Sequence, residues 1–140
     1  MKVLYTAHAS ATGGREGHGA TSDGKVDVVL STPRELGGNG GPGTNPEQLF
    51  ATGYSACFLG ALKFAASQEK VKIPAEAKVS AAVGIGPRDD GKGFGITVEL
   101  TIDVPELERG TVEDLVKKAD IICPYSHSIR GNVDVTLTVA

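Results

Sequence analysis

The sequence predicts an α+β protein in which several short strands accompany one long apolar helix. Apolar residues alternate with polar residues in a number of separate segments, which is the pattern of half-buried strands. One internal segment is instead apolar around nearly the whole circumference of a helix. The expected order is strands, long helix, two strands, helix, strand. The regular strand–helix alternation of a parallel α/β sheet is therefore not expected.

Strands are expected in six places, and glycine-rich turns join several of them. The alternation is cleanest at 96–104, where branched apolar residues alternate with threonine and acidic residues. Asp-Gly at 23–24 and the segment 89–93 predict hairpin turns. The predicted strands are 3–7, 18–22, 26–30, 79–85, 96–104 and 133–139.

The long helix is expected to begin at Pro46 and to end near residue 70. The segment 45–48 places asparagine at the N-cap, proline at the first helical position and glutamine where a capping box closes. From residue 49 to 66 the helix is apolar on almost every side, and such a helix is normally buried on every side. A chain with short strands covers it with difficulty, so we expect a homodimer in which two copies share one core.

A second helix is expected to begin at Thr111 and to end at Cys123. Thr111 and Asp114 form the Thr-x-x-Asp pattern of a capping box, and the residues that follow carry a single apolar stripe. Pro124 ends the helix because the residue before a proline is driven out of the helical conformation.

Length and composition indicate one globular domain over residues 1–140. Hydrophobic residues make up 40% of the chain and charged residues 22%. The net charge of −3 disfavours a nucleic-acid partner, which usually requires a basic patch. No stretch is expected to reach the roughly 18 apolar residues of a membrane span. The N-terminus lacks the apolar core of a secretory signal, so we expect a cytoplasmic protein without a membrane partner.

The chain has two cysteines, Cys57 and Cys123, which form no Cys-x-x-Cys motif. In a reducing compartment such a pair is more often catalytic, redox-active or metal-binding than structural. A single cysteine on a buried helix is usually only a small hydrophobic residue. Cys123, however, precedes Pro124 at a helix end, where the chain can bend. The pair suggests a reversible disulfide, although spacing does not show that the two side chains meet.

Neither a nucleotide cofactor nor a metal ion is expected. The segment 38–43 matches Gly-x-Gly-x-x-Gly but lacks the strand–turn–helix context of a dinucleotide site, and no lysine follows it as a P-loop requires. Cys57, Cys123 and His127 are the best candidate metal ligands. They are too few for a structural zinc site, which usually has four.

Arg15 and Glu47 have both an ordinary and a functional interpretation. Arg15 lies in a glycine-rich turn, where arginine is usually solvated, and Glu47 suits the first turn of a helix. Arg15 could also bring a guanidinium to a thiolate or to an anionic leaving group. Glu47 and Cys57 are ten residues apart, which is roughly 15 Å along one helix. A site containing both would therefore take Glu47 from the helix of a partner chain.

Three motifs together resemble the organic hydroperoxide resistance (Ohr) proteins of the OsmC-like superfamily. The first is the arginine turn 12–17, the second surrounds Cys57 at 45–58, and the third surrounds Cys123 at 122–135. The resemblance covers essentially the whole chain in order. It implies the OsmC-like fold, with antiparallel sheets wrapped around a long buried central helix in an intertwined homodimer.

The same resemblance implies a thiol peroxidase that reduces alkyl or lipid hydroperoxides to alcohols. Cys57 would be the peroxidatic and Cys123 the resolving cysteine, with Arg15 and Glu47 as the activating pair. A protein that carries dihydrolipoyl groups would reduce the resulting disulfide. Apolar residues near Cys57 are candidates for a hydrophobic entrance: Phe50, Tyr54 and Phe58.

Three alternatives stay open at this point. An OsmC-type peroxidase could prefer hydrogen peroxide to organic hydroperoxides. A redox sensor could use the same cysteines without turnover, and a small-ligand-binding or structural protein would show no rapid thiol oxidation.

Overall fold

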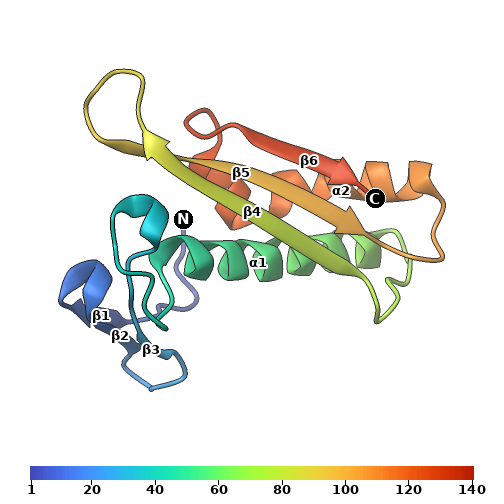
Figure 1. Cartoon of the computed structure of the whole chain (residues 1–140). Helices are drawn as coiled ribbons and strands as arrows, with labels where there is room; N and C mark the ends of the chain where they lie inside the picture. The colour runs from blue at the N-terminus through green and yellow to red at the C-terminus, as the bar shows by residue number, and fades with distance from the viewer. The chain divides into compact units, whose positions relative to one another are not determined.

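The computed structural model describes residues 1–140 and divides them into two compact units, Met1–Leu49 and Phe50–Ala140. Each unit has its own three-stranded sheet, and the long helix α1 (Pro46–Gln68) contains the boundary between them. Strands and helices follow one another in the expected α+β order (Figure 1). The assignment of residues 1–140 to one domain stays a prediction.

The sheet of the first unit is antiparallel, in the order β1 (Ala9–Thr12), β2 (His18–Thr21), β3 (Asp27–Val29). The predicted strand 3–7 is wrong, because β1 begins only at Ala9, opposite the last residue of β2. Alternation showed a segment suited to a strand but not whether a neighbouring strand was long enough to pair with it. Two short 3₁₀ helices that the sequence analysis missed, Gly14–Glu16 and Arg34–Leu36, lie in the connections.

Helix α1 begins where the capping signals placed it. The Gln48 backbone N–H donates to Asn45 Oδ1 at 2.9 Å, so Asn45 is the N-cap. The helix ends at Gln68, and Lys70 follows in the left-handed conformation at φ 58°. The Val71 N–H donates to the Ala66 carbonyl, which together with the Lys70 conformation is a Schellman closure.

In the single chain α1 is buried along one side only, which corrects the expectation of burial all round. Its buried residues are Tyr54, Phe58, Ala61, Leu62, Ala65 and Ala66. Phe64 on the other side is 55% exposed, and the small residues Ala56 and Gly60 are exposed as well. Helix α1 is apolar on nearly every side, but its own chain covers only one of those sides.

The expectation that no stretch is apolar enough to cross a membrane is also corrected. By length and composition α1 meets that criterion, with a mean hydropathy of 1.3 over an 18-residue window. The core helix of a soluble protein meets the same criterion. Polar residues interrupt the apolar residues along α1, so the helix has no long uninterrupted apolar run, yet its average hydropathy is high.

The sheet of the second unit has the order β4 (Lys78–Pro87), β5 (Phe94–Asp103), β6 (Val135–Val139) (Figure 1). Strands β4 and β5 form the expected antiparallel hairpin. Strands β5 and β6 are parallel, which corrects the expectation that the sheets are antiparallel. Parallel neighbours need a long crossover connection, and the helical segment between Asp103 and Val135 supplies it.

That crossover contains α2 (Arg109–Ile122) and α3 (Pro124–Ile129). The expected capping box at Thr111 is wrong, because α2 begins two residues earlier and Glu108 is its N-cap. The Val112 N–H donates to the Glu108 carbonyl, so the first turn closes upstream of Thr111. The predicted end is confirmed: Cys123 has φ −64° and ψ 118°, outside the helical region, and precedes Pro124.

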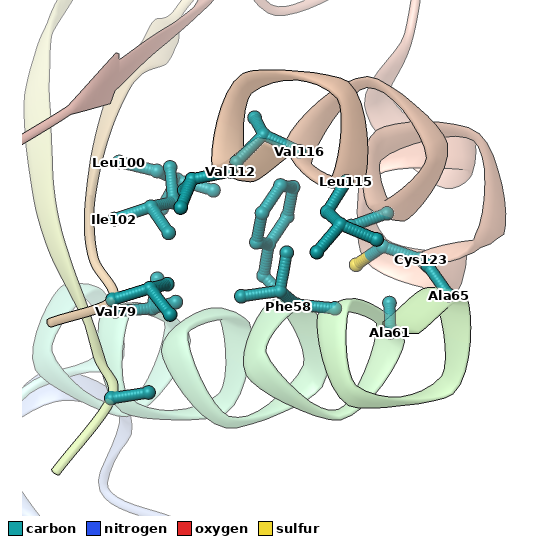
Figure 2. Packing of buried hydrophobic residues seen from close by; sticks show 14 of the residues in the cluster. Phe58, Ala61, Ala65, Val79, Leu100, Ile102, Val112, Leu115, Val116 and Cys123 are labelled. Carbon is teal, nitrogen blue, oxygen red and sulfur yellow. The ribbon is translucent and has the colours of Figure 1, made fainter. Parts of the chain in front are cut away.

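The core of the second unit lies between its helices and one face of its sheet. On β5 the inward residues Val98, Leu100 and Ile102 are buried, whereas the intervening Thr97, Glu99 and Thr101 are exposed. Figure 2 shows the Phe58 ring rising from α1 toward α2, among side chains that close around it. The labelled neighbours are Val112, Leu115, Val116, Leu100 and Ile102.

Candidate active site

Cys57 and Cys123 meet in the second unit, with their Sγ atoms 3.6 Å apart. Both are free thiols; Cys123 is fully buried and Cys57 is half-buried. A disulfide bond is about 2.05 Å long. The pair is therefore a reduced dithiol whose sulfur atoms need to approach by about 1.5 Å to form a bond. The sequence left open whether the two cysteine side chains meet, and the structure shows that they do.

The break between α2 and α3 places Cys123. Its extended backbone turns the chain between the two helices, while its N–H still donates to the Ala119 carbonyl and its carbonyl accepts from the His127 N–H. Figure 2 shows the Cys123 sulfur directed into the packed interior beside Leu115. The sequence Cys-Pro thus ends one helix, starts the next and directs the thiol inward.

Two opposing influences act on the Cys57 thiol, and the net effect is a raised pKa. Burial is the larger cause, because it disfavours the charged thiolate. The Tyr125 backbone N–H donates to Cys57 and lowers the pKa, and the neighbouring Cys123 raises it further. Within its own unit the thiol is thus not activated, so a reactive thiolate requires a positive charge from elsewhere.

Three aromatic rings pack together where the first half of α1 meets the start of α3: Phe50, Tyr54 and Tyr125. Each pair of ring centroids is 5.8 Å apart, and Phe50 and Tyr125 are stacked. A Cβ at Gly53 would lie 3.0 Å from the Tyr125 hydroxyl, so glycine makes room for that ring on α1. Tyr54 is fully buried, whereas Tyr125 is 38% exposed.

These exposures change which side chains suit the hydrophobic entrance. Phe58 and Tyr54 are fully buried, so they form core and not entrance. Phe50 is half-buried and Tyr125 exposed, so these two suit it better. The sequence analysis missed Tyr125. Tyr125 follows Cys123-Pro124 directly and lies at the start of a helix. That position beside the second cysteine could have indicated that the residue lies near the thiol pair.

A buried hydrogen bond joins Tyr54 on α1 to Ser126 on α3. The Tyr54 hydroxyl oxygen lies 2.6 Å from Ser126 Oγ, and both residues are buried. Burial raises the Tyr54 pKa, an effect that the bond to Ser126 partly opposes. The phenol therefore stays protonated at neutral pH, and the two hydroxyls satisfy each other. Sequence reasoning missed this bond as well, since nothing in the spacing pairs residues 72 positions apart.

Arg15 and Glu47 form a bidentate ion pair in the first unit. Arg15 Nη1 donates to Glu47 Oε2 at 2.8 Å, and Nη2 donates to Oε1 at 2.7 Å. This two-point contact fixes the plane of the guanidinium as well as its position. The bond from Arg15 lowers the pKa of Glu47, so the carboxylate stays charged at neutral pH.

Glycines shape the turn that carries Arg15. Gly13 has φ 72°, in the left-handed region that side chains with a Cβ rarely adopt. A Cβ at Gly17 would collide with the Thr12 backbone carbonyl, so the two ends of the turn approach too closely for any other residue. The turn is therefore a tight, glycine-dependent loop that presents one arginine.

The four candidate residues thus form two pairs, the cysteines in the second unit and the arginine and glutamate in the first. Their roles in catalysis remain predictions. No group of three histidine, cysteine or acidic side chains is arranged to hold a metal ion. His127, weighed earlier as a possible ligand, is an exposed residue of α3.

Comparisons with known proteins agree with this fold. The OsmC-like protein family matches residues 37–138. An organic hydroperoxide resistance protein of Xanthomonas axonopodis pv. citri is 60% identical over 139 residues, which covers 99% of this chain and 96% of that protein. OhrB of Bacillus subtilis is 42% identical, covering 96% of this chain and 97% of that protein.

The solved structures agree in three dimensions. The crystal structure of an organic hydroperoxide resistance protein from Legionella pneumophila superimposes with a TM-score of 0.93 at 45% identity, covering 99% of both chains. The chain belongs to the OsmC-like family, within its organic hydroperoxide resistance branch. The expected α+β, OsmC-like fold is thereby confirmed.

Proposed function

We propose that the protein is a thiol peroxidase that reduces alkyl or lipid hydroperoxides to alcohols. The observation that carries the proposal is the pair of free thiols with sulfur atoms 3.6 Å apart. The names of the relatives, which refer to resistance to organic hydroperoxides, support the substrate class. Phe50 and Tyr125, from the two segments that carry the cysteines, stack on each other, and their apolar surface suits an alkyl chain better than hydrogen peroxide.

In the proposed reaction the Cys57 thiolate attacks one oxygen of the hydroperoxide. The O–O bond breaks, an alkoxide leaves and takes up a proton, and Cys57 becomes a sulfenic acid. The Cys123 sulfur then attacks Cys57 Sγ, and hydroxide leaves with the thiol proton as water. The S–S contact shortens from 3.6 Å to a bond, and fast closure protects Cys57 from irreversible oxidation.

Arg15 acts chiefly on the peroxide in this scheme. A fall in thiol pKa from about 8.5 to about 6 raises the thiolate fraction at pH 7 roughly 30-fold. Nucleophilicity falls at the same time, with a slope of about 0.4–0.5, which leaves a gain of roughly two- to threefold. A larger contribution must come from orienting the peroxide and stabilising the departing oxyanion. Glu47 holds the guanidinium for that task through its two-point contact.

We further propose that the working form is a homodimer. The uncovered apolar side of α1, with Phe64 55% exposed, supports a second copy as its cover. The spacing of Glu47 and Cys57 along α1 supports a site that combines the Arg15–Glu47 pair of one protomer with the cysteines of its partner. A cytoplasmic location and reduction by a dihydrolipoyl-bearing protein complete the proposal, and both rest on the likeness to the Ohr proteins.

The test is intact mass and thiol count after one equivalent of an alkyl hydroperoxide is added to reduced protein. Loss of two hydrogens with consumption of both thiols is the expected result. Free thiols after exposure, or addition of oxygen without a disulfide, would overturn the two-cysteine mechanism. Oxidation without turnover under dihydrolipoyl or any other dithiol would instead indicate a redox sensor. Faster turnover of hydrogen peroxide than of alkyl hydroperoxides would contradict the substrate class.

A further inference from the structure

Two cross-links, each formed by one pair of residues, join α1 to the chain around Cys123. One is the thiol contact between Cys57 and Cys123, and the other is the hydrogen bond between Tyr54 and Ser126. Tyr54 precedes Cys57 by three residues, and Ser126 follows Cys123 by three residues. Residues three apart lie on the same side of a helix. The hydroxyl pair therefore lies one turn from the thiol pair along α1, and on the other segment Ser126 lies in the first turn of α3, directly after the cap residue Cys123.

The hydroxyl pair is a directional contact between α1 and α3, and it adds to the packing of the Tyr125 ring against Phe50 and Tyr54. Helix α3 has only six residues, too few for a helix to be stable without tertiary contacts. Tyr54 is fully buried and Ser126 is 3% exposed, so neither hydroxyl can exchange its partner for bulk water. The Tyr125 ring packing is apolar and can slide, whereas the hydroxyl pair fixes one atom of each helix at 2.6 Å.

The resolving step depends on where Cys123 is held. Once Cys57 is a sulfenic acid, it meets either the Cys123 thiol or a second hydroperoxide, and the second reaction yields the irreversible sulfinic acid. Small displacements from the attack geometry slow an intramolecular step strongly. An anchor that does not involve the reacting sulfur therefore determines which reaction prevails.

We propose that Tyr54 and Ser126 are positioning residues of the resolving step: their buried hydrogen bond holds Cys123 within reach of oxidised Cys57. The inference rests on the proposed peroxidase function and deepens it. The chemistry itself belongs to the cysteines. Cys123 Sγ bonds to Cys57 Sγ as the S–O bond of the sulfenic acid breaks, and the hydroxyl leaves with the Cys123 proton as water. The two hydroxyls transfer no atom or electron.

The experiment compares Tyr54→Phe and Ser126→Ala with the unaltered protein. Each reduced protein receives increasing tert-butyl hydroperoxide, and acid-quenched samples are analysed by intact mass. The readout is the ratio of disulfide, which has lost two hydrogens, to sulfinic acid, which has gained two oxygens. We expect both variants to form the disulfide about tenfold more slowly, with a matching rise in sulfinic acid at a given peroxide concentration. The first oxidation of Cys57 should change less.

The double variant Tyr54→Phe/Ser126→Ala separates two explanations for slow disulfide formation. One is the loss of the bond that positions Cys123, and the other is the instability caused by an unpaired buried hydroxyl. Each single variant leaves one buried hydroxyl without its partner, whereas the double variant removes both polar groups. Its melting temperature should therefore recover relative to the single variants, while its disulfide formation stays slow. Ser128→Ala is the matched control, because the exposed Ser128 hydroxyl bonds only the Tyr125 carbonyl on the same short helix. It should behave as the unaltered protein.

The positioning role would be overturned if the single variants formed the disulfide at the rate of the unaltered protein. It would also be overturned if the double variant recovered both its melting temperature and its rate of disulfide formation. Failure of the unaltered protein to form any disulfide would instead overturn the proposed function itself. The two failures are thus distinguishable within one set of samples.

Discussion

At the residue scale, the two thiols and the arginine–glutamate pair have complementary properties. Burial raises the pKa of Cys57, and the single backbone N–H from Tyr125 does not reverse that effect. Arg15 is held in a fixed plane by Glu47, yet it keeps 37% of its side-chain surface exposed. In the proposed chemistry the oriented, accessible guanidinium of Arg15 supplies the positive charge that the Cys57 thiol lacks.

Replacement of each cysteine separates the two chemical steps. Cys57→Ser should abolish turnover of alkyl hydroperoxides, because no other thiol lies beside the Tyr125 N–H. Cys123→Ser should allow one oxidation per chain and then accumulate sulfenic and sulfinic acids at Cys57. Hydroperoxide consumption and intact mass measure both effects. Sustained turnover of Cys123→Ser with a lipoyl dithiol would contradict its resolving role.

Glu47→Gln should weaken the orientation of Arg15 and change the acid stability of the fold. The folded-state pKa of Glu47 is lowered by Arg15, so the carboxylate contributes stability above its unfolded pKa of about 4.5. That contribution is lost as the pH falls through the lower folded-state pKa. Because Arg15 is partly exposed, we expect about 1 kcal/mol or less. Urea unfolding between pH 7 and pH 3 should show a smaller decline for Glu47→Gln than for the unaltered protein, and an equal decline would contradict the assignment.

At the element scale, short backbone signals set the position of every candidate side chain. The proline after Cys123 ends α2, begins α3 and turns the thiol into the core. The Asn45 cap begins α1, which carries Cys57 and Tyr54 on a side that packs inward. The glycine turn presents Arg15 by allowing a backbone path that other residues cannot follow. Each of the two candidate pairs therefore depends as much on helix ends and turns as on its reactive groups.

Gly17→Ala tests the turn that carries Arg15. The new Cβ collides with the backbone carbonyl of Thr12, which cannot move aside as a flexible side chain could. The turn must open, and peroxidase turnover should fall by about ten- to a hundredfold through loss of the oriented guanidinium. Gly14→Asn is the matched control, because Gly14 has open space around its Cβ position and asparagine tolerates its φ of 57°. Equal activity of the two variants would remove the turn from the mechanism.

At the scale of the whole molecule, the apolar side of α1 is the feature that a single chain leaves unfinished. Six residues of this helix are buried by its own chain, whereas Phe64 and the exposed Ala56 and Gly60 have no such cover. Exposed apolar residues grouped on one side of a helix are a common feature of protein interfaces. The proposed dimer covers this surface and also brings a second Arg15–Glu47 pair into the assembly.

Phe64→Glu should dissociate the proposed dimer. A carboxylate on each copy would face an apolar and like-charged partner, so sedimentation should show a monomer at concentrations where the unaltered protein is a dimer. Turnover should fall in parallel if the site draws on both protomers. Lys117→Glu, a charge change on the exposed side of α2, is the control and should leave the dimer intact. A monomeric unaltered protein would refute the dimer directly.

The sequence by itself determined those features that depend on residues close together in the chain. The cap at Asn45, the helix end before Pro124, the alternation of β5 and the hairpin between β4 and β5 were all predicted, because each depends on neighbouring residues. The motifs around Arg15, Cys57 and Cys123 also indicated the family. Two predictions from local patterns were wrong. Residues 3–7 have no neighbouring strand to pair with, and α2 begins two residues before Thr111.

Only the tertiary structure decided which distant residues meet. The 3.6 Å thiol contact, the Tyr54–Ser126 bond and the two-point Arg15–Glu47 pair join residues 66, 72 and 32 positions apart. The parallel pairing of β5 with β6 likewise depends on how the crossover helices pack. Such contacts arise from burial and packing across the whole chain, and no periodicity along the sequence encodes them.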